Sequence, residues 1–150
     1  MLIYVDADAA PKSVLRITRD AGAKYDIPVI TVSSINHEIR GEHHIQVDPA
    51  PQATDMEIVR RIRSNVPTIV VTQDYGLAAL VLARKAHAIS PSGLWFTSDN
   101  IDRLLAERAV SAKLRRGGKV RLRGPRARTD NDDRQFEESL LRLIESVRQP

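Results

Sequence analysis

The chain contains no cysteine. Disulfide bonds, zinc sites built from thiolates and cysteine nucleophiles are therefore excluded. Aromatic residues make up only 4% of the chain, so we expect no extended platform on which nucleic-acid bases stack. No apolar run approaches the ~20 residues of a membrane-spanning helix, and the first residues lack the basic segment that opens a signal peptide. We therefore expect a cytoplasmic protein without a membrane partner.

Most of the positive charge lies in one segment of the second half of the chain. The 150 residues carry 23 Lys and Arg against 19 Asp and Glu, a net charge of +4, and this length fits a single domain. Between Arg103 and Arg128 there are ten basic residues and one acid, Glu107. This segment either holds nucleic-acid phosphates or is a solvated helix end followed by a basic loop over about 117–129. The candidate phosphate-binding residues are Lys113, Arg115, Arg116, Lys119, Arg121, Arg123, Arg126 and Arg128, and also Arg134, whose alternative role is an ion pair near the start of the last helix.

Two aspartates directly follow the first predicted strand. Leu2 to Val5 is apolar and largely β-prone; Asp6 and Asp8 come next, and Pro11 then favours the start of a helix. Residues i and i+2 at the end of a strand point the same way, so both carboxylates can enter one small volume, where they repel each other. A hard divalent cation such as Mg²⁺ or Mn²⁺ would remove that repulsion. The alternative is that Asp8 caps the following helix.

Strand and helix patterns alternate along the chain. Apolar runs predict strands over residues 2–5, 27–32, 44–47, 67–72 and 87–90. Helical spacing predicts helices over residues 12–25, 55–64, 75–86, 97–116 and 130–147. Thr54 and Glu57 have the spacing of a capping box at the start of the second of these helices. The alternation predicts an α/β fold with a mostly parallel sheet.

This order predicts where four aspartates meet. In open parallel sheets, ligand sites lie at the carboxyl ends of the strands. Asp6 and Asp8 follow the first strand, Asp55 begins the helix after the third strand, and Asp74 follows the strand over 67–72. We therefore expect these four carboxylates at one edge of the sheet, as candidate metal ligands and catalytic residues.

Several separated motifs resemble those of the YaiI/YqxD family of bacterial proteins over essentially the full chain. They are VDADAAP near the start, TDMEIV, VTQDYGLA, AHAISPSGLWFTSDNI, and Gly124-Pro125 followed by Asp133 to Phe136. The resemblance implies a PIN-like fold, a three-layer α/β sandwich shared with metal-dependent nucleases, over residues 1–150. By motif position, it also implies that the same four aspartates form the acidic site. One position departs from the pattern, because Ala10 stands where the family usually carries cysteine.

The aspartates and the basic segment together predict a Mg²⁺- or Mn²⁺-dependent phosphodiesterase that acts on RNA, or otherwise on single-stranded nucleic acid. One alternative is a phosphatase resembling the haloacid dehalogenases, with Asp6 as nucleophile and Asp8 as acid/base. In that family, however, a threonine or valine follows the second aspartate after one residue, whereas here Ala10-Pro11 intervenes. A third possibility is a non-catalytic module that binds nucleic acid. A homo-oligomer is compatible with all three interpretations.

Overall fold

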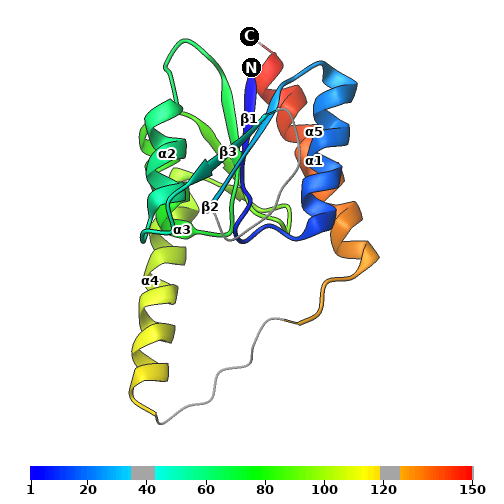
Figure 1. The fold of residues 1–150 in the computed structure, drawn as a ribbon. Helices are drawn as coiled ribbons and strands as arrows, with labels where there is room; N and C mark the ends of the chain where they lie inside the picture. Colours follow the sequence, from blue (N-terminus) through cyan, green and yellow to red (C-terminus); the bar gives the residue numbers. More distant parts are fainter. Residues whose placement is uncertain (35–42, 119–125, 150) are drawn as a thin grey trace.

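A six-stranded, mostly parallel sheet forms the centre of the molecule (Figure 1). The computed structural model describes residues 1–34, 43–118 and 126–149. The strand order is β3-β2-β1-β4-β5-β6; β6 alone is antiparallel to its neighbour. The strands are β1 (Leu2–Asp6), β2 (Val29–Ser34), β3 (His44–Val47), β4 (Thr68–Val71), β5 (His87–Ile89) and β6 (Trp95–Phe96).

Helices cover both faces of this sheet. The helices are α1 (Lys12–Tyr25), α2 (Ala53–Arg61), α3 (Tyr75–Ala83), α4 (Ser98–Arg116) and α5 (Asp130–Arg148). Helices α1 and α5 lie side by side on one face, while α2, α3 and the first half of α4 lie on the other (Figure 1). The α/β class and the three-layer arrangement predicted from the sequence are confirmed. None of the helices in the described residues is long and apolar enough to span a membrane.

The alternation of side chains along β1 decides which residues face which helices. Ile3 and Val5 are buried in the hydrophobic cluster that includes α1 and α5. Tyr4 belongs to the opposite cluster, with residues of α2, α3 and α4. Because side chains alternate along a strand, Asp6 points to the same side as Tyr4. The last residue of the central strand therefore presents a carboxylate toward α2 and α3.

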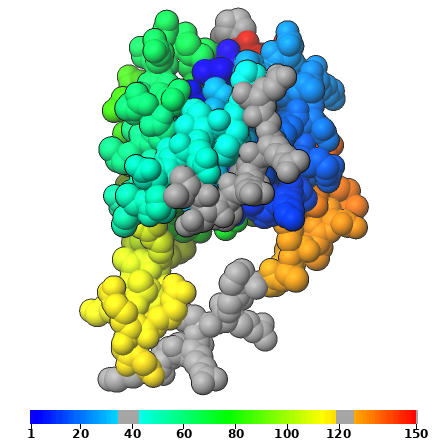
Figure 2. Space-filling view, viewed as in Figure 1, coloured from blue at the N-terminus to red at the C-terminus, as the bar shows by residue number. Residues whose placement is uncertain are grey.

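Helix α4 extends well beyond the sheet (Figures 1 and 2). It begins with a capping box in which Thr97 and Asn100 satisfy each other's backbone N–H groups. Only Ile101 and Leu104, both in its first half, are buried. The second half is largely exposed to solvent, and the helix ends at Arg116, the end predicted from the sequence.

Two local predictions near α2 are wrong. The helix begins at Ala53 and ends at Arg61, and Gln52 occupies its N-cap position without a side-chain hydrogen bond. Thr54 and Glu57 therefore form no capping box: Thr54 donates to Asp8, and Glu57 pairs with Arg60 and Arg61. Thr54 thus bonds a residue that is distant in sequence, whereas Glu57 pairs with arginines three and four residues later on its own helix.

Candidate acidic active site

The acidic side chains lie at the carboxyl ends of the parallel strands, on either side of the point where the strand order reverses. The chain crosses from β1 to β2 on one side, and β4 pairs with the other side of β1. Crevices at such reversal points are the usual ligand sites of open α/β sheets. Asp6 ends β1 and Asp74 follows β4, so the sheet topology brings them together across this crevice.

Thr72 links these two aspartates. Its hydroxyl group donates a hydrogen bond of 2.9 Å to Oδ2 of Asp6 and accepts one of 2.9 Å from the backbone N–H of Asp74. Asp6 is only 6% exposed and Thr72 is 1% exposed. This buried bridge fixes the orientation of the Asp6 carboxylate relative to the turn that carries Asp74.

Asp74 also caps helix α3. Its Oδ1 accepts a hydrogen bond of 3.1 Å from the N–H of Leu77. The same oxygen lies 3.7 Å from Nη1 of Arg108 on α4, in an ion pair between two partly exposed side chains. The capping bond and the ion pair with Arg108 both hold the Asp74 side chain in place near the mouth of the crevice.

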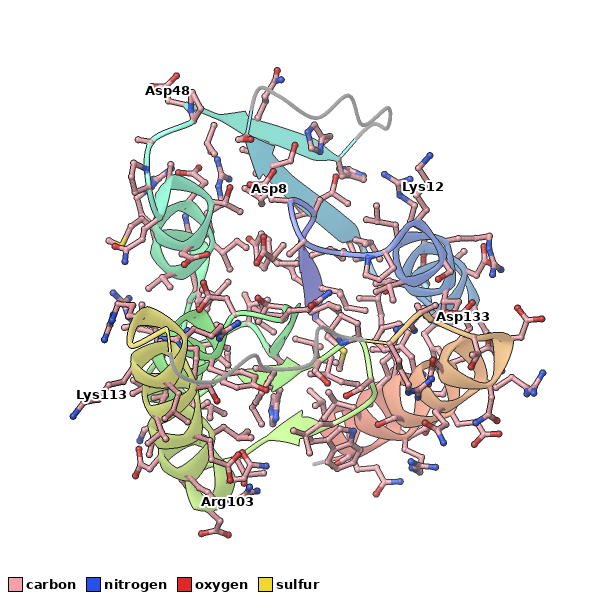
Figure 3. The ribbon with its side chains drawn as sticks, turned by 90° about the horizontal axis from the view of Figure 1, so that it is seen from below. Asp8, Lys12, Asp48, Arg103, Lys113 and Asp133 are labelled. Carbon is pink, nitrogen blue, oxygen red and sulfur yellow. The ribbon has the colours of Figure 1, made fainter. Side chains whose placement is uncertain are left out.

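Asp8 connects three elements of the fold. Its Oδ1 accepts a hydrogen bond of 2.9 Å from the N–H of Ser34, and its Oδ2 accepts one of 2.8 Å from Thr54. Asp8 lies near the middle of the molecule when the carboxyl ends of the strands are viewed end on (Figure 3). It does not cap helix α1, whose N-cap is Pro11 without a side-chain bond. Asp8 thus holds the end of β2 and the start of α2 against the turn after β1.

A pocket of about 380 Å³ opens between these elements. Asp55, in the first turn of α2, completes its acidic lining from the side opposite the strands. The sequence prediction that four aspartates reach one edge of the sheet agrees with this lining. The polar side chains around the pocket are those of Asp6, Asp8, Ser34, Gln52, Thr54, Asp55 and Asp74.

The carboxylates in this pocket shift one another's protonation. Burial raises the pKa of Asp6 to about 6; the Thr72 hydrogen bond opposes this shift, and the charges of Asp8 and Asp74 add to it. Burial likewise raises the pKa of Asp55 to about 7, with further contributions from the charges of Asp74 and Asp6 and from a hydrogen bond to Asp74. Asp6 and Asp55 therefore hold their protons more tightly than ordinary aspartates do.

The donor set matches a hard divalent cation, because every candidate ligand is a carboxylate oxygen. Mutual repulsion of the acids is the conflict that such a cation would relieve. In the described parts of the chain, however, no three Asp, Glu or His side chains already form a group that could hold a metal ion. A hydrogen bond already joins Asp55 and Asp74, so a cation that bound both carboxylates would displace that bond.

Ala10 does not line this pocket. Its side chain packs against the hydrophobic cluster that includes α1 and α5, on the other side of the turn after β1. Its neighbour Ala9 does line the pocket, and the carbonyl of Ala9 accepts a hydrogen bond of 2.7 Å from Gln73. The position at which the resembling proteins carry cysteine is thus separated from the acidic side chains.

The predicted phosphate-binding residues fall into three groups. Lys113, Arg115, Arg116 and Arg134 are exposed, and Lys113 points away from the body of the molecule (Figure 3). Arg126 and Arg128 form ion pairs of 2.7 Å with Asp132 and 2.6 Å with Asp133 at the start of α5. Lys119, Arg121 and Arg123 lie outside the described residues.

The sequence reasoning missed Arg108, which pairs with Asp74 at the acidic pocket. A signal for it exists, because Ile101, Leu104 and Arg108 follow the i, i+3, i+7 spacing of one helix face. The two apolar residues on that face are buried against the body, so the third is directed toward it. Its charge alone does not distinguish this arginine from the other basic residues among the ten between Arg103 and Arg128.

The chain is similar to bacterial proteins throughout its length. The family model described as "Uncharacterized BCR, YaiI/YqxD family" matches residues 4–146. A UPF0178 protein of Clostridium novyi is 44% identical over 151 aligned residues, covering 99% of this chain and 98% of that protein. A UPF0178 protein of Heliobacterium modesticaldum is 39% identical over 144 residues, covering 96% and 97%. No solved structure gives a significant match, so the PIN-like resemblance stays a prediction. From the family model and these relatives, the chain belongs to the YaiI/YqxD family.

Proposed function

We propose that this protein is a divalent-cation-dependent phosphodiesterase that cleaves RNA or other single-stranded nucleic acid at the acidic pocket. The observation that carries the proposal is the convergence of Asp6, Asp55 and Asp74 on one pocket at the strand-order reversal. The raised pKa values of Asp6 and Asp55 support it, because both carboxylates are buried and lie beside other negative charges. Carboxylates kept together in this way are typical of functional sites.

Asp6, Asp55 and Asp74 would hold Mg²⁺ or Mn²⁺, which on binding lowers the pKa of a water molecule and neutralises charge on a phosphate. Thr72 keeps Asp6 and Asp74 in a fixed mutual orientation through its two hydrogen bonds. Asp8 holds the wall that carries Asp55 in place through its bond to Thr54. These residues pre-organise the pocket before any ligand enters it.

Arg108 and the exposed end of α4 would contact the substrate backbone. Arg108 lies beside Asp74 at the edge of the pocket, where its guanidinium can pair with a phosphate instead. Lys113, Arg115 and Arg116 form no ion pair with any acid in the described ranges. Such free cations neutralise phosphates without reading sequence, so binding should weaken steeply as salt rises. Arg126 and Arg128 would first have to leave their aspartate partners, and we assign them a smaller contribution.

Cleavage of a mixed pool of labelled single-stranded RNA and DNA with Mn²⁺ tests the proposal. The native protein is compared with Asp6→Asn and Asp55→Asn, and with Asp102→Asn as the matched control. Asp102 is an exposed aspartate on α4 outside the pocket lining, so its replacement changes the same charge at a distance. We expect cutting by the native protein and the control, and a loss of at least ~100-fold in the two pocket variants, the scale of removing a key electrostatic group.

Two results would contradict the proposal. Cutting that persists in Asp6→Asn and Asp55→Asn would place the activity elsewhere or in a contaminant. Absence of cutting by the native protein, together with metal-independent binding of the pool, would instead identify a non-catalytic binding module.

A further inference from the structure

A second pocket lies at the opposite edge of the sheet, away from the acidic pocket. It has a volume of about 190 Å³ and is lined by Leu2, Tyr4, Arg60, Arg61, Arg63, Val66 and Thr68. Leu2 and Thr68 are the first residues of β1 and β4, whereas Asp6 is the last residue of β1. Four residues of extended strand separate the two edges, about 13 Å at ~3.3 Å per residue.

Helix α2 reaches both pockets, with opposite charge at its two ends. Its first residues, including Asp55, line the acidic pocket, and its last two residues, Arg60 and Arg61, line the second one. The C-terminal end of a helix carries a partial negative charge, which favours arginines there. Arg63 and the buried Tyr4 line the same small pocket. The partial charge at the end of α2 accounts for Arg60 and Arg61 but not for these two residues.

Glu57 organises two of these arginines without neutralising the pocket. Its Oε1 accepts hydrogen bonds of 2.8 Å from Nη2 of Arg60 and 2.8 Å from Nε of Arg61, and its Oε2 accepts one of 3.3 Å from Nε of Arg60. The terminal amino groups of Arg61 remain without a partner among the described residues. Arg63 forms no ion pair with any described acid. Three guanidinium groups against one carboxylate leave two positive charges in excess.

Tyr4 supplies a polar group to the wall of the same pocket. The residue is 3% exposed, and its hydroxyl group forms no hydrogen bond with the described residues. No buried side-chain oxygen or nitrogen in the described residues lacks a partner, so this hydroxyl is reached by solvent in the pocket. Arg61 and Arg63 are close enough to oppose the rise in the Tyr4 pKa that burial causes. The pocket therefore combines two cations with a phenolic hydroxyl group that is open to a ligand.

We propose that this pocket, formed by Tyr4, Arg61 and Arg63, is a binding site for a phosphate group. Two uncompensated positive charges match a phosphate dianion, and planar guanidinium groups bind phosphate oxygens in pairs. The volume is below the ~300–1,000 Å³ of sites that enclose whole drug-sized ligands, so the pocket takes a phosphate or the phosphoryl end of a larger molecule. The site is separate from the acidic pocket and contains no candidate metal ligand.

Titration of the protein with inorganic phosphate, followed by ³¹P NMR, tests this site. EDTA is present throughout, so the result does not depend on the acidic pocket, and sodium chloride keeps the ionic strength constant. We expect saturable binding that weakens by about tenfold or more in Arg61→Gln and Arg63→Gln, the effect of losing a hydrogen bond to a charged group. Tyr4→Phe should weaken it as well, and Arg103→Gln, on α4 away from the pocket, should leave it unchanged.

The variants differ in how much else they disturb. Arg61→Gln removes a partner of Glu57, whereas exposed Arg63 has no ion-pair partner among the described residues, so Arg63→Gln gives the decisive result if Arg61→Gln does not fold. A second arm compares short oligonucleotides with a 5′-phosphate and with a 5′-hydroxyl, to distinguish a polymer end from free phosphate. The proposal is overturned if native protein binds neither phosphate source, or if Arg63→Gln and Arg103→Gln bind phosphate as tightly as native protein.

Discussion

Replacing Asp6 with asparagine should stabilise the metal-free protein at pH 8. The aspartate must give up its proton there in a buried site beside the charges of Asp8 and Asp74, and this raises its pKa from 3.8 to about 6. Asparagine has nearly the same shape and no charge, so it removes the repulsion. Its oxygen can still accept the hydrogen bond that Thr72 donates to Asp6.

The size of the effect follows from the two pKa values of Asp6. At about 1.36 kcal/mol per pH unit, the difference between 3.8 and about 6 corresponds to ~3 kcal/mol of unfolding free energy at pH 8. The aspartate has two side-chain oxygens, one of which accepts a hydrogen bond from the N–H of Asp8, whereas asparagine has only one oxygen. Losing the bond to the Asp8 N–H costs ~1 kcal/mol. The net gain is ~2 kcal/mol, or roughly 4–8 °C in Tm for a domain of this size.

The gain should depend on pH in a defined direction. The folded protein keeps the proton on Asp6 up to about pH 6, whereas the unfolded chain loses it near 3.8. Folding therefore takes up a proton between these values, and this contribution to stability falls as pH rises through the window. Native protein thus gains ~1.4 kcal/mol from this group on going from pH 8 to pH 5, and the advantage of the asparagine shrinks by that amount.

Urea unfolding followed by circular dichroism in EDTA, at pH 5 and pH 8, measures this difference, with Asp102→Asn as the control. An Asp6→Asn variant that is less stable than native protein at pH 8 would refute the reasoning. The reasoning would also be refuted if the difference in unfolding free energy between Asp6→Asn and native protein were the same at both pH values, because the charge of Asp6 would then contribute nothing to folding.

Three further predictions concern contacts that hold the site and the layers together, each measured by urea unfolding. Thr54→Val should destabilise the protein by ~1–3 kcal/mol, because it removes a buried donor to Asp8; a change under ~0.5 kcal/mol would show that this bond is unimportant. Gly22→Ala should cost ~1–3 kcal/mol, since a Cβ there would overlap Val29 and lie 2.7 Å from the Ile27 oxygen; an unchanged midpoint would contradict this. Thr129→Ala should cost ~1 kcal/mol by removing the capping box of α5, and no loss would mean that solvent replaces the cap.

The acidic pocket was predictable because two local signals and one topological rule suffice to locate it. An apolar run that ends in Asp6, and another followed by Asp74, can be recognised within a few residues of sequence. The alternation of strands and helices then implies a parallel sheet, whose carboxyl ends lie together. The bounds of α1 and β3 were predicted for a similar reason, since helical spacing and β-prone runs are local properties.

The contacts that local sequence patterns do not predict are set by how the elements pack and join. Thr54 was expected to cap its own helix, but its hydroxyl lies closer to Asp8, 46 residues earlier, and donates there. Arg128 pairs with Asp133 because of the path by which the chain enters α5. Arg108 reaches Asp74 because of the angle at which α4 leaves the sheet, which spacing alone does not determine.

The central claim is that the carboxylates of the acidic pocket hold a divalent cation. Direct Mn²⁺ binding, measured from the loss of the free-ion signal in electron paramagnetic resonance, tests this without requiring a substrate. We expect Mn²⁺ to bind native protein and Asp102→Asn, and binding to weaken by at least ~10-fold in Asp6→Asn and in Asp55→Asn. Equal binding by all four proteins, or no binding by native protein at millimolar Mn²⁺, would contradict the account.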